Sequence, residues 1–354
     1  MRIKQIFFLC ISFFISVTSV ADNYYLNHSL ISHNTNGGVG IIQNPSGRFS
    51  DDGEFLVGVS FESPYKRLYA RVQFMPWLET IVRYTEGTHR PYNPGSSQTW
   101  KDKGFDVKIK LLDESEYIPA LAIGFNDFGG TGAYASEYLV GSKRFNNIDF
   151  SLGVATGKFG DRSNIINPFS LISDDYKVRG GGGDRGGGRL GLNNWFTGDA
   201  AIFAGLEYYT PIPNLTMKLE YDTSDYRDVQ GKQYVFYQSD NLFKVDSKFN
   251  FALNYRLNMS TRDKADLAIG ITRGNTFYAN MAIHSNLNDL GREKYRAPKE
   301  TINIPYLEPF ESLNDDWQKY LTELIMWQLG NEGIVTNSLS FKGNELEAKV
   351  TSGR

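Results

Sequence analysis

Apolar and polar residues alternate with a period of two in many segments of the chain. From residue 54 to residue 61, every second position is apolar: Phe55, Val57, Val59 and Phe61. This alternation indicates a β-strand with apolar surroundings on one face and polar surroundings on the other. The same pattern predicts about twelve strands, an even number of the kind that closed bacterial barrels use. They are expected at residues 54–61, 67–74, 78–85, 105–112, 117–125, 134–145, 148–156, 201–209, 215–221, 249–257, 265–273 and 277–283.

Alternation alone fits two all-β architectures, because a soluble sandwich turns its apolar face inward and a membrane barrel turns it outward. Strand length favours the barrel, since a tilted strand needs about nine to eleven residues to cross a bilayer. Aromatic residues also gather at the predicted strand ends, as interfacial girdles require. These aromatic residues are Tyr84, Trp100, Tyr117, Tyr208, Tyr209, Tyr221, Tyr255 and Tyr278. The fold class expected is an all-β transmembrane barrel.

The connections between predicted strands differ in length. Tight connections are expected at 113–116, 211–214 and 273–276, and long ones at 87–102, 159–199 and 224–246. Outer-membrane barrels have short turns on one rim and longer loops on the other. The connection lengths therefore favour the same architecture.

Residues 1–21 have a basic start, an apolar run from 6 to 17 and small residues at the end. This pattern predicts a secretory signal, and its apolar run is too short to span a membrane. The mature chain is then expected to begin near Asp22. The one cysteine of the chain, Cys10, lies inside this signal, so neither disulfides nor thiol catalysis are expected. A lipid-modified Cys10 is the alternative, but the three residues before it are large and apolar.

The remaining chain divides into four parts. Residues 22–49 form an N-terminal segment, 50–285 the barrel, 286–312 a polar linker, and 313–354 the start of a small α+β periplasmic domain, with a helix expected over 313–329 and two short strands after it. A barrel of about twelve strands is narrow, and side chains or an N-terminal segment such as residues 24–49 are candidates to fill it.

Charge and motifs exclude several function classes. The formal net charge of −3 argues against nucleic acid as a partner, because phosphate binding needs an excess of Lys and Arg. The glycine-rich stretch 179–189 lacks the Gly-Lys-Ser/Thr ending of a phosphate loop, so we interpret it as a mobile surface loop. The four histidines are scattered without metal-ligand spacing, and neither a Gly-x-Ser-x-Gly motif nor carboxylates opposed across a cleft are evident. The protein is therefore expected to lack a metal and a cofactor and not to be an enzyme.

Charged residues occupy the polar face of several predicted strands and would line the lumen of a barrel. The lumen candidates are Arg71, Arg83, Lys108, Lys110, Lys218, Glu79, Glu220 and Arg256. Two interpretations stay open, since pore linings use ordinary charge pairing. One is a salt-bridged interior that replaces a hydrophobic core, and the other is a path for a polar chain.

Several uncommon sequence strings follow one another along the chain. The string GGVGIIQNPSGR covers 37–48, PWLET covers 76–80, KDKGFDVK covers 101–108, and RGNTF covers 273–277. With Arg83-Tyr84-Thr85, Gly130-Thr131-Gly132 and Glu137-Tyr138-Leu139-Val140, they make the chain similar to the YjbH/GfcD family of exopolysaccharide and capsule export proteins. The resemblance extends from about residue 37 to residue 290.

This resemblance implies a protein of the Gram-negative outer membrane, in contact with its lipid, that serves secretion of an extracellular polysaccharide with periplasmic and lipoprotein partners. The lumen candidates, together with Arg179, Arg185 and Arg189 of the glycine-rich loop, become candidates for contact with the polymer. This chain departs from the family pattern in length, because family members continue through a periplasmic region into a second barrel-like half. A general porin and an outer-membrane hydrolase are the alternatives.

Overall fold

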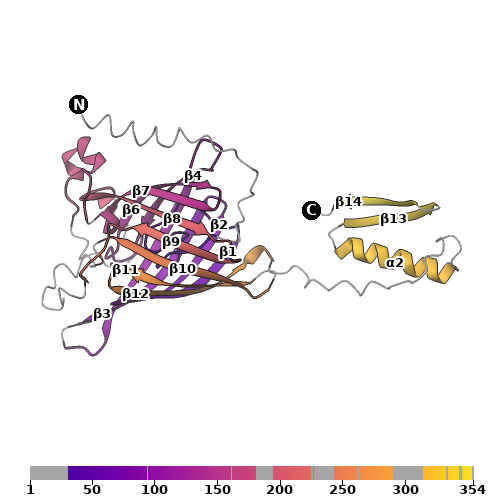
Figure 1. The fold of residues 1–354 in the computed structure, drawn as a ribbon, viewed down its shortest axis with the longest axis horizontal. Helices are drawn as coiled ribbons and strands as arrows, with labels where there is room; N and C mark the ends of the chain where they lie inside the picture. Colours follow the sequence, from indigo (N-terminus) through magenta and orange to yellow (C-terminus); the bar gives the residue numbers. More distant parts are fainter. Residues whose placement is uncertain are drawn as a thin grey trace. The chain divides into compact units, whose positions relative to one another are not determined.

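The computed structural model describes residues 31–93, 95–160, 162–180, 194–224, 226, 243–260, 263–289, 314–331, 334–342 and 345–352. The expected signal, Arg185, Arg189 and most of the expected linker lie outside these residues. In the described part, twelve strands form a closed barrel (Figure 1). They are β1 (Glu54–Glu62), β2 (Tyr65–Met75), β3 (Leu78–Pro91), β4 (Thr99–Leu112), β5 (Ala120–Asn126), β6 (Ser136–Phe145), β7 (Ile148–Gly157), β8 (Ala200–Tyr209), β9 (Leu215–Tyr221), β10 (Phe249–Asn258), β11 (Lys264–Thr272) and β12 (Thr276–Asn286).

Each strand pairs antiparallel with its neighbour in sequence, and the first strand pairs with the last. Strands β1 and β12 run in register from Glu54↔Asn286 to Glu62↔Tyr278. This pairing closes the sheet and leaves it without a free edge, the condition for strands to span a bilayer. The expectation of a closed antiparallel barrel of about twelve strands is confirmed.

Apolar side chains point out of the barrel and polar side chains point into it. In β1, Val57 and Phe61 are exposed, whereas Ser60 and Glu62 are buried. The outward apolar belt runs around the barrel and includes Leu68, Val82, Leu139, Leu152, Phe251, Leu267, Ile269, Met281 and Ile283. This inside-out arrangement is the one that a membrane barrel requires and a sandwich does not.

None of the helices in the described ranges has the length and apolar character needed to cross a membrane.

Because successive strands are antiparallel, their connections fall alternately on two rims. One rim carries residues 76–77, 113–119, 146–147, 210–214 and 259–263, and we call it the short-turn rim. The other carries 63–64, 92–98, 127–135, 158–199, 222–248 and 273–275, and we call it the long-loop rim. The expected difference in connection length between the rims is present.

Two expectations about the connections are wrong. The stretch 87–102 was expected to be a loop, but β3 and β4 continue to the pair Pro91↔Thr99, because cross-strand contacts such as the Lys101–Glu86 ion pair extend the ladder. Only residues 92–98 connect these strands. The tight turn at 273–276 was grouped with the short turns, but it joins β11 to β12 and therefore lies on the long-loop rim.

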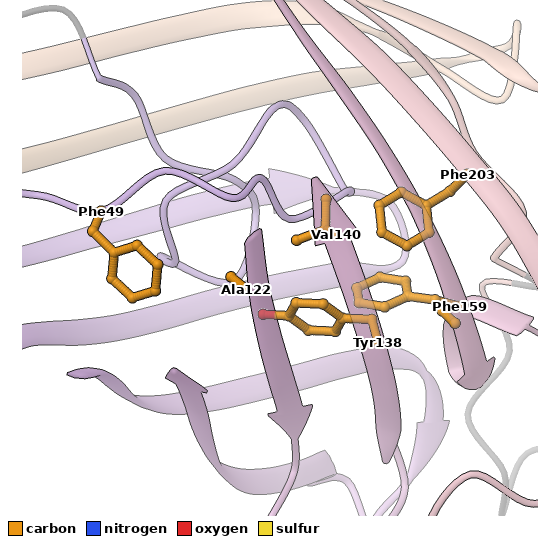
Figure 2. Packing of buried hydrophobic residues seen from close by; sticks show 7 residues of the cluster. Phe49, Ala122, Tyr138, Val140, Phe159 and Phe203 are labelled. Carbon is orange, nitrogen blue, oxygen red and sulfur yellow. The ribbon is translucent and has the colours of Figure 1, made fainter. Parts of the chain in front are cut away.

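The interior of the barrel is packed. Figure 2 shows one apolar cluster in which Phe49 and Ala122 lie with Tyr138, Phe159 and Phe203. A second cluster joins Ile41 and Ile42 to Ala252, Ala268 and Tyr278 of the wall. A third lies toward the long-loop rim and contains Tyr65, Trp100, Ala133, Tyr134, Tyr226 and Phe243. Two of these clusters depend on residues that precede β1.

The C-terminal unit consists of α2 (Asp315–Asn331), β13 (Ile334–Lys342) and β14 (Glu345–Ser352). The side chain of Asn314 accepts a hydrogen bond of 2.9 Å from the backbone N–H of Trp317. An Asn at this position caps the helix by satisfying one of its unpaired N–H groups. Strands β13 and β14 form an antiparallel hairpin, and α2 lies against β13.

Candidate functional site

Residues 31–50, which we call the inner segment, lie inside the barrel. They join β1 through residues 51–53 and therefore enter from the short-turn rim. The inner segment folds on itself, with bridges His33↔Val39 and Gly40↔Pro45. Nearly all of its residues are buried. It makes no β-ladder with a barrel strand in the described residues, so other contacts must hold it in place.

Close steric fit sets the position of this segment. Gly37 has φ +92°, and a Cβ atom there would lie 2.3 Å from the ring of Tyr69. Opposite, a Cβ at Gly205 of β8 would lie 2.3 Å from the side chain of Ile41. Glycine is therefore needed on the inner segment and on the wall where the two approach each other.

Acidic side chains of the wall accept hydrogen bonds from the inner segment. Glu220 accepts from the consecutive backbone N–H groups of Ile42, Gln43 and Asn44 at 3.0, 2.9 and 3.0 Å. Glu79 accepts from the N–H of Val39 at 3.2 Å, and Glu207 accepts from the Ser32 hydroxyl. Successive N–H groups that converge on one carboxylate form an anion-binding concavity, here occupied by a wall residue.

Basic side chains of the wall donate to the carbonyl groups of the same segment. Lys108 donates to the carbonyls of Val39 at 3.1 Å and Arg48 at 2.8 Å. Lys218 donates to the carbonyl of Ile41 at 2.6 Å. Two arginines complete this set, Arg256 with the carbonyl of Ile31 at 2.6 Å and Arg71 with that of Gly37 at 3.4 Å. The wall therefore binds both kinds of backbone group.

Charges on the wall are also paired with each other. Lys108 lies 3.1 Å from Glu79, and Arg256 donates to both oxygens of Asp266 at 2.6 and 2.7 Å. Arg71 forms an ion pair with Glu54. Buried charges need such partners, because an unpaired charge loses its hydration without compensation. The lumen is consequently polar without a large excess of one sign.

One ion-pair cluster anchors the end of the inner segment near the short-turn rim. Arg48 donates to both oxygens of Asp149 at 2.7 Å and also pairs with Glu114. Burial acts to raise the pKa of the Glu114 carboxyl, but Arg48 and Lys143 outweigh it and hold the pKa below its usual value. Next to Arg48, the N–H of Gly47 donates to the Ser142 hydroxyl at 2.8 Å.

His33 is the titratable group at the other end of the inner segment. Burial lowers its pKa from 6.5 to about 4, although Asp266 at 3.4 Å opposes this shift. The charges of Lys218 and Arg71 lower the pKa further. His33 is therefore uncharged at neutral pH while the segment is docked.

Of the eight lumen candidates predicted from the sequence, six form hydrogen bonds with the inner segment: Arg71, Glu79, Lys108, Lys218, Glu220 and Arg256. Arg83 pairs instead with Asp106 at 2.8 Å and lies over the ring of Tyr134. Lys110 pairs with Asp113 near the short-turn rim, and its Nζ lies 5.4 Å from the ring centroid of Phe49 in the inner segment. For all eight candidates, contact with a polymer stays a prediction.

Arg179 lies outside the lumen. It donates to both oxygens of Glu137 at 2.7 and 2.8 Å, and Glu137 belongs to the outward-facing positions of β6. The pair fixes part of the connection 158–199 against the outer wall. Arg185 and Arg189 of the same connection lie outside the described residues.

Sequence reasoning did not single out His33, Arg48, Asp149 or Asp266. Arg48 ends the string 37–48 on which the family resemblance rests, and that string was the available signal. The contacts of the other three become visible only in the folded barrel, because His33 meets Asp266 and Arg48 meets Asp149 across more than 100 positions of sequence.

The inner segment forms the floor of a pocket at the short-turn rim. The pocket has a volume of about 340 Å³ and is lined in part by Ile31, Arg48, Phe49 and Lys110. Among the described residues, no group of three or more His, Cys, Asp or Glu has the arrangement of a metal site. The charged wall of the lumen and the inner segment bound to it form the candidate functional site.

Comparison with known proteins finds relatives of this chain. A family model described as "Exopolysaccharide biosynthesis protein YbjH" matches residues 32–354. A protein of Escherichia coli (strain K12), called "Uncharacterized lipoprotein YjbH", is 38% identical over 259 residues. This match covers 72% of the chain and 35% of the E. coli protein, so the chain spans about a third of that relative.

Solved structures of porins show weaker similarity. The KdgM porin is 9% identical with a TM-score of 0.33, over 66% of this chain and 98% of that one. A triple mutant of the Rhodopseudomonas blastica porin is 9% identical with a TM-score of 0.25, over 63% of this chain and 55% of that one. At this level of similarity, the barrel assignment rests on the strand pairing of the chain itself.

Proposed function

Because this chain belongs to the YjbH family of exopolysaccharide biosynthesis proteins, we propose that it is a non-enzymatic β-barrel component of exopolysaccharide or capsule secretion in the outer membrane of a Gram-negative bacterium. The observation that carries the proposal is a closed barrel with an apolar exterior and a charged lumen in a member of this family. Family membership supports the role in polysaccharide secretion, and the barrel supports the location in a membrane.

The rims support an orientation in the membrane. Barrels of the outer membrane have their short turns in the periplasm and their long loops outside the cell. Residues 51–53 and the end of β12 both lie at the short-turn rim, so both flanking parts of the chain leave the barrel on that side. The inner segment then enters from the periplasm, and α2, β13 and β14 belong to a periplasmic unit suited to contact periplasmic and lipoprotein partners.

The lumen favours a secretion component over the two alternatives. A general porin needs an open path for small solutes, whereas residues 31–50 lie within this lumen. A hydrolase of the glycosidase type needs two carboxylates facing its substrate across a cleft. The buried lumen carboxylates Glu79, Glu207, Glu220 and Asp266 instead contact basic side chains or the inner segment.

A deletion strain tests the proposed function. Loss of the gene is expected to reduce secreted polysaccharide while uptake of small solutes stays unchanged, and expression of the gene from a plasmid should restore secretion. Fractionation should place the protein in the outer membrane with heat-dependent gel mobility. Unchanged polysaccharide, or slower solute uptake with normal polysaccharide, would contradict the proposal, and cleavage of the polymer by purified protein would contradict its non-enzymatic part.

The start of the mature chain is a separate question. The E. coli relative is called a lipoprotein, and Cys10 of this chain lies outside the described residues. We propose removal of residues 1–21 as an ordinary signal, with Asp22 as the first mature residue. Mass spectrometry of the mature N-terminus distinguishes Asp22 from a lipid-modified Cys10.

A further inference from the structure

The charged wall of the lumen binds its peptide occupant mainly through backbone groups. Glu79 and Glu220 accept from N–H groups, and Lys108 and Lys218 donate to carbonyl groups. These contacts recognise a polar chain by its donors and acceptors instead of its side chains. A sugar hydroxyl is both a donor and an acceptor, so a carbohydrate chain presents the same two kinds of group.

The inner segment can leave the lumen without breaking the barrel. All twelve strands are joined by their own ladder, which closes through β1 and β12, and the inner segment contributes no strand to it. Its bridges, His33↔Val39 and Gly40↔Pro45, lie within the segment itself. When the inner segment leaves, its contacts with the wall are lost, but the hydrogen bonds between the barrel strands remain.

The charge balance of the wall indicates which kind of chain can replace the segment. Lys108 is paired with Glu79, Arg256 with Asp266 and Arg71 with Glu54. Because these basic groups already have carboxylate partners, the wall does not offer an excess of positive charge. It suits a chain bound through hydroxyl groups more than one bound through many anionic groups.

We propose, on the basis of the function proposed above, that the wall around residues 31–50 is the binding site for the secreted polysaccharide. This polysaccharide is a hydroxyl-rich polymer of low charge. The inner segment occupies this site when no polymer passes and is displaced toward the periplasm when polymer enters. The hydroxyl groups of the polymer then replace the peptide groups as partners of four wall residues, Glu79, Lys108, Lys218 and Glu220.

A covalent lock on the inner segment tests this proposal. Arg48 and Asp149 face each other across an ion pair, so R48C with D149C in the full chain can be bridged by a short bifunctional thiol reagent. Bridged cells are expected to secrete no more polysaccharide than the gene-deletion strain. The untreated double variant, which lacks both charges of the pair, should secrete, and each single variant treated with the reagent should secrete as much as the same variant untreated. Normal secretion with the bridge in place would overturn the proposal.

A second measurement does not depend on that ion pair. Ser46 is a small, buried residue of the inner segment, and S46C should report its exposure to a hydrophilic maleimide. Labelling is expected in cells that synthesise the polymer and not in cells that lack the polymerising enzyme. Equal labelling in both strains would overturn the proposal. If gene deletion reduces secretion but locking does not, the proposed function stands and this inference alone fails.

Discussion

Arg48 donates two hydrogen bonds of 2.7 Å to the two carboxylate oxygens of Asp149, a residue 101 positions later in the chain. This bidentate pair fixes the inner segment to β7. It is buried, with the Arg48 and Asp149 side chains 6% and 2% exposed. The pair lies beside the pocket at the short-turn rim and is the connection through which the docked state can be tested.

Removal of this guanidinium should destabilise the barrel. R48M leaves the carboxylate of Asp149 buried without its partner, and breaking a buried ion pair costs about 3–5 kcal/mol. The free energy of unfolding, measured by urea titration in lipid vesicles, is expected to fall by this order. K66Q is the control, because the Lys66–Glu86 pair is 3.9 Å long and exposed, and it should have no measurable effect. Equal stability of R48M and the unmodified protein would show that the pair does not anchor the segment.

Loss of the Glu220 charge should loosen the middle of the inner segment. The variant E220Q replaces a carboxylate that accepts three N–H bonds with an amide that also carries donors. Hydrogen exchange at residues 42–44 should accelerate about ten- to hundredfold, the equivalent of roughly 1.5–3 kcal/mol for bonds to a charged group. E137Q is the matched control, since Glu137 is buried outside the lumen. Similar acceleration in both variants would contradict a specific role for Glu220.

Lipid contact at the outer face can be tested with one outward residue. Ile269 lies near the middle of β11 and is 56% exposed. An arginine at the bilayer midplane of a barrel costs about 2–4 kcal/mol, whereas one at the interface costs about 0–1 kcal/mol. I269R should therefore lower the stability of the barrel in vesicles much more than I118R, which lies in a connection at the short-turn rim. If both variants are as stable as the unmodified protein, the apolar belt does not face lipid.

Acidification should weaken the docked segment through His33. Its pKa is lowered by burial from 6.5 to about 4, so between these values the undocked histidine binds more protons than the docked one. Stability therefore decreases as the pH falls from 6.5 toward 4, by up to about 1.4 kcal/mol per unit. Between pH 7 and pH 5, the unmodified protein should lose about 2 kcal/mol more than H33Q in urea titration, by the same linkage relation.

The H33Q comparison removes the effect of other groups. Asp266, Lys218 and Arg71 face His33 from three strands and are present in both proteins. Their titration therefore contributes to both curves. Parallel pH profiles for H33Q and the unmodified protein would show that His33 is not the source of the pH dependence.

Tertiary pairing changed the expectations at the strand ends. Beyond Gly87, the sequence carries turn-forming residues and the alternation weakens, so a long loop was predicted there. In the barrel, β3 and β4 continue beyond this point because each provides the hydrogen-bonding partner of the other, up to Pro91↔Thr99. The rim on which the 273–275 turn lies is likewise set by the number of strands that precede the turn, and not by the length of the turn.

The sequence by itself determined which side chains point outward, how many strands there are, and that the lumen is charged. Side-chain direction in a strand is local and alternates with each residue, so Phe55 and Leu56 must face opposite sides whatever surrounds them. The helix cap at Asn314 is local in the same way.

Only the tertiary structure decided what the lumen charges bind. Glu220 meets the amide groups of Ile42, Gln43 and Asn44 across 176 to 178 positions of sequence. That meeting requires closure of β1 onto β12 and a register around the ring that brings β9 beside the returning N-terminal segment. A charge in a strand can be paired, hydrated or bound to a peptide with the same local pattern, and only the packed interior selects among these partners.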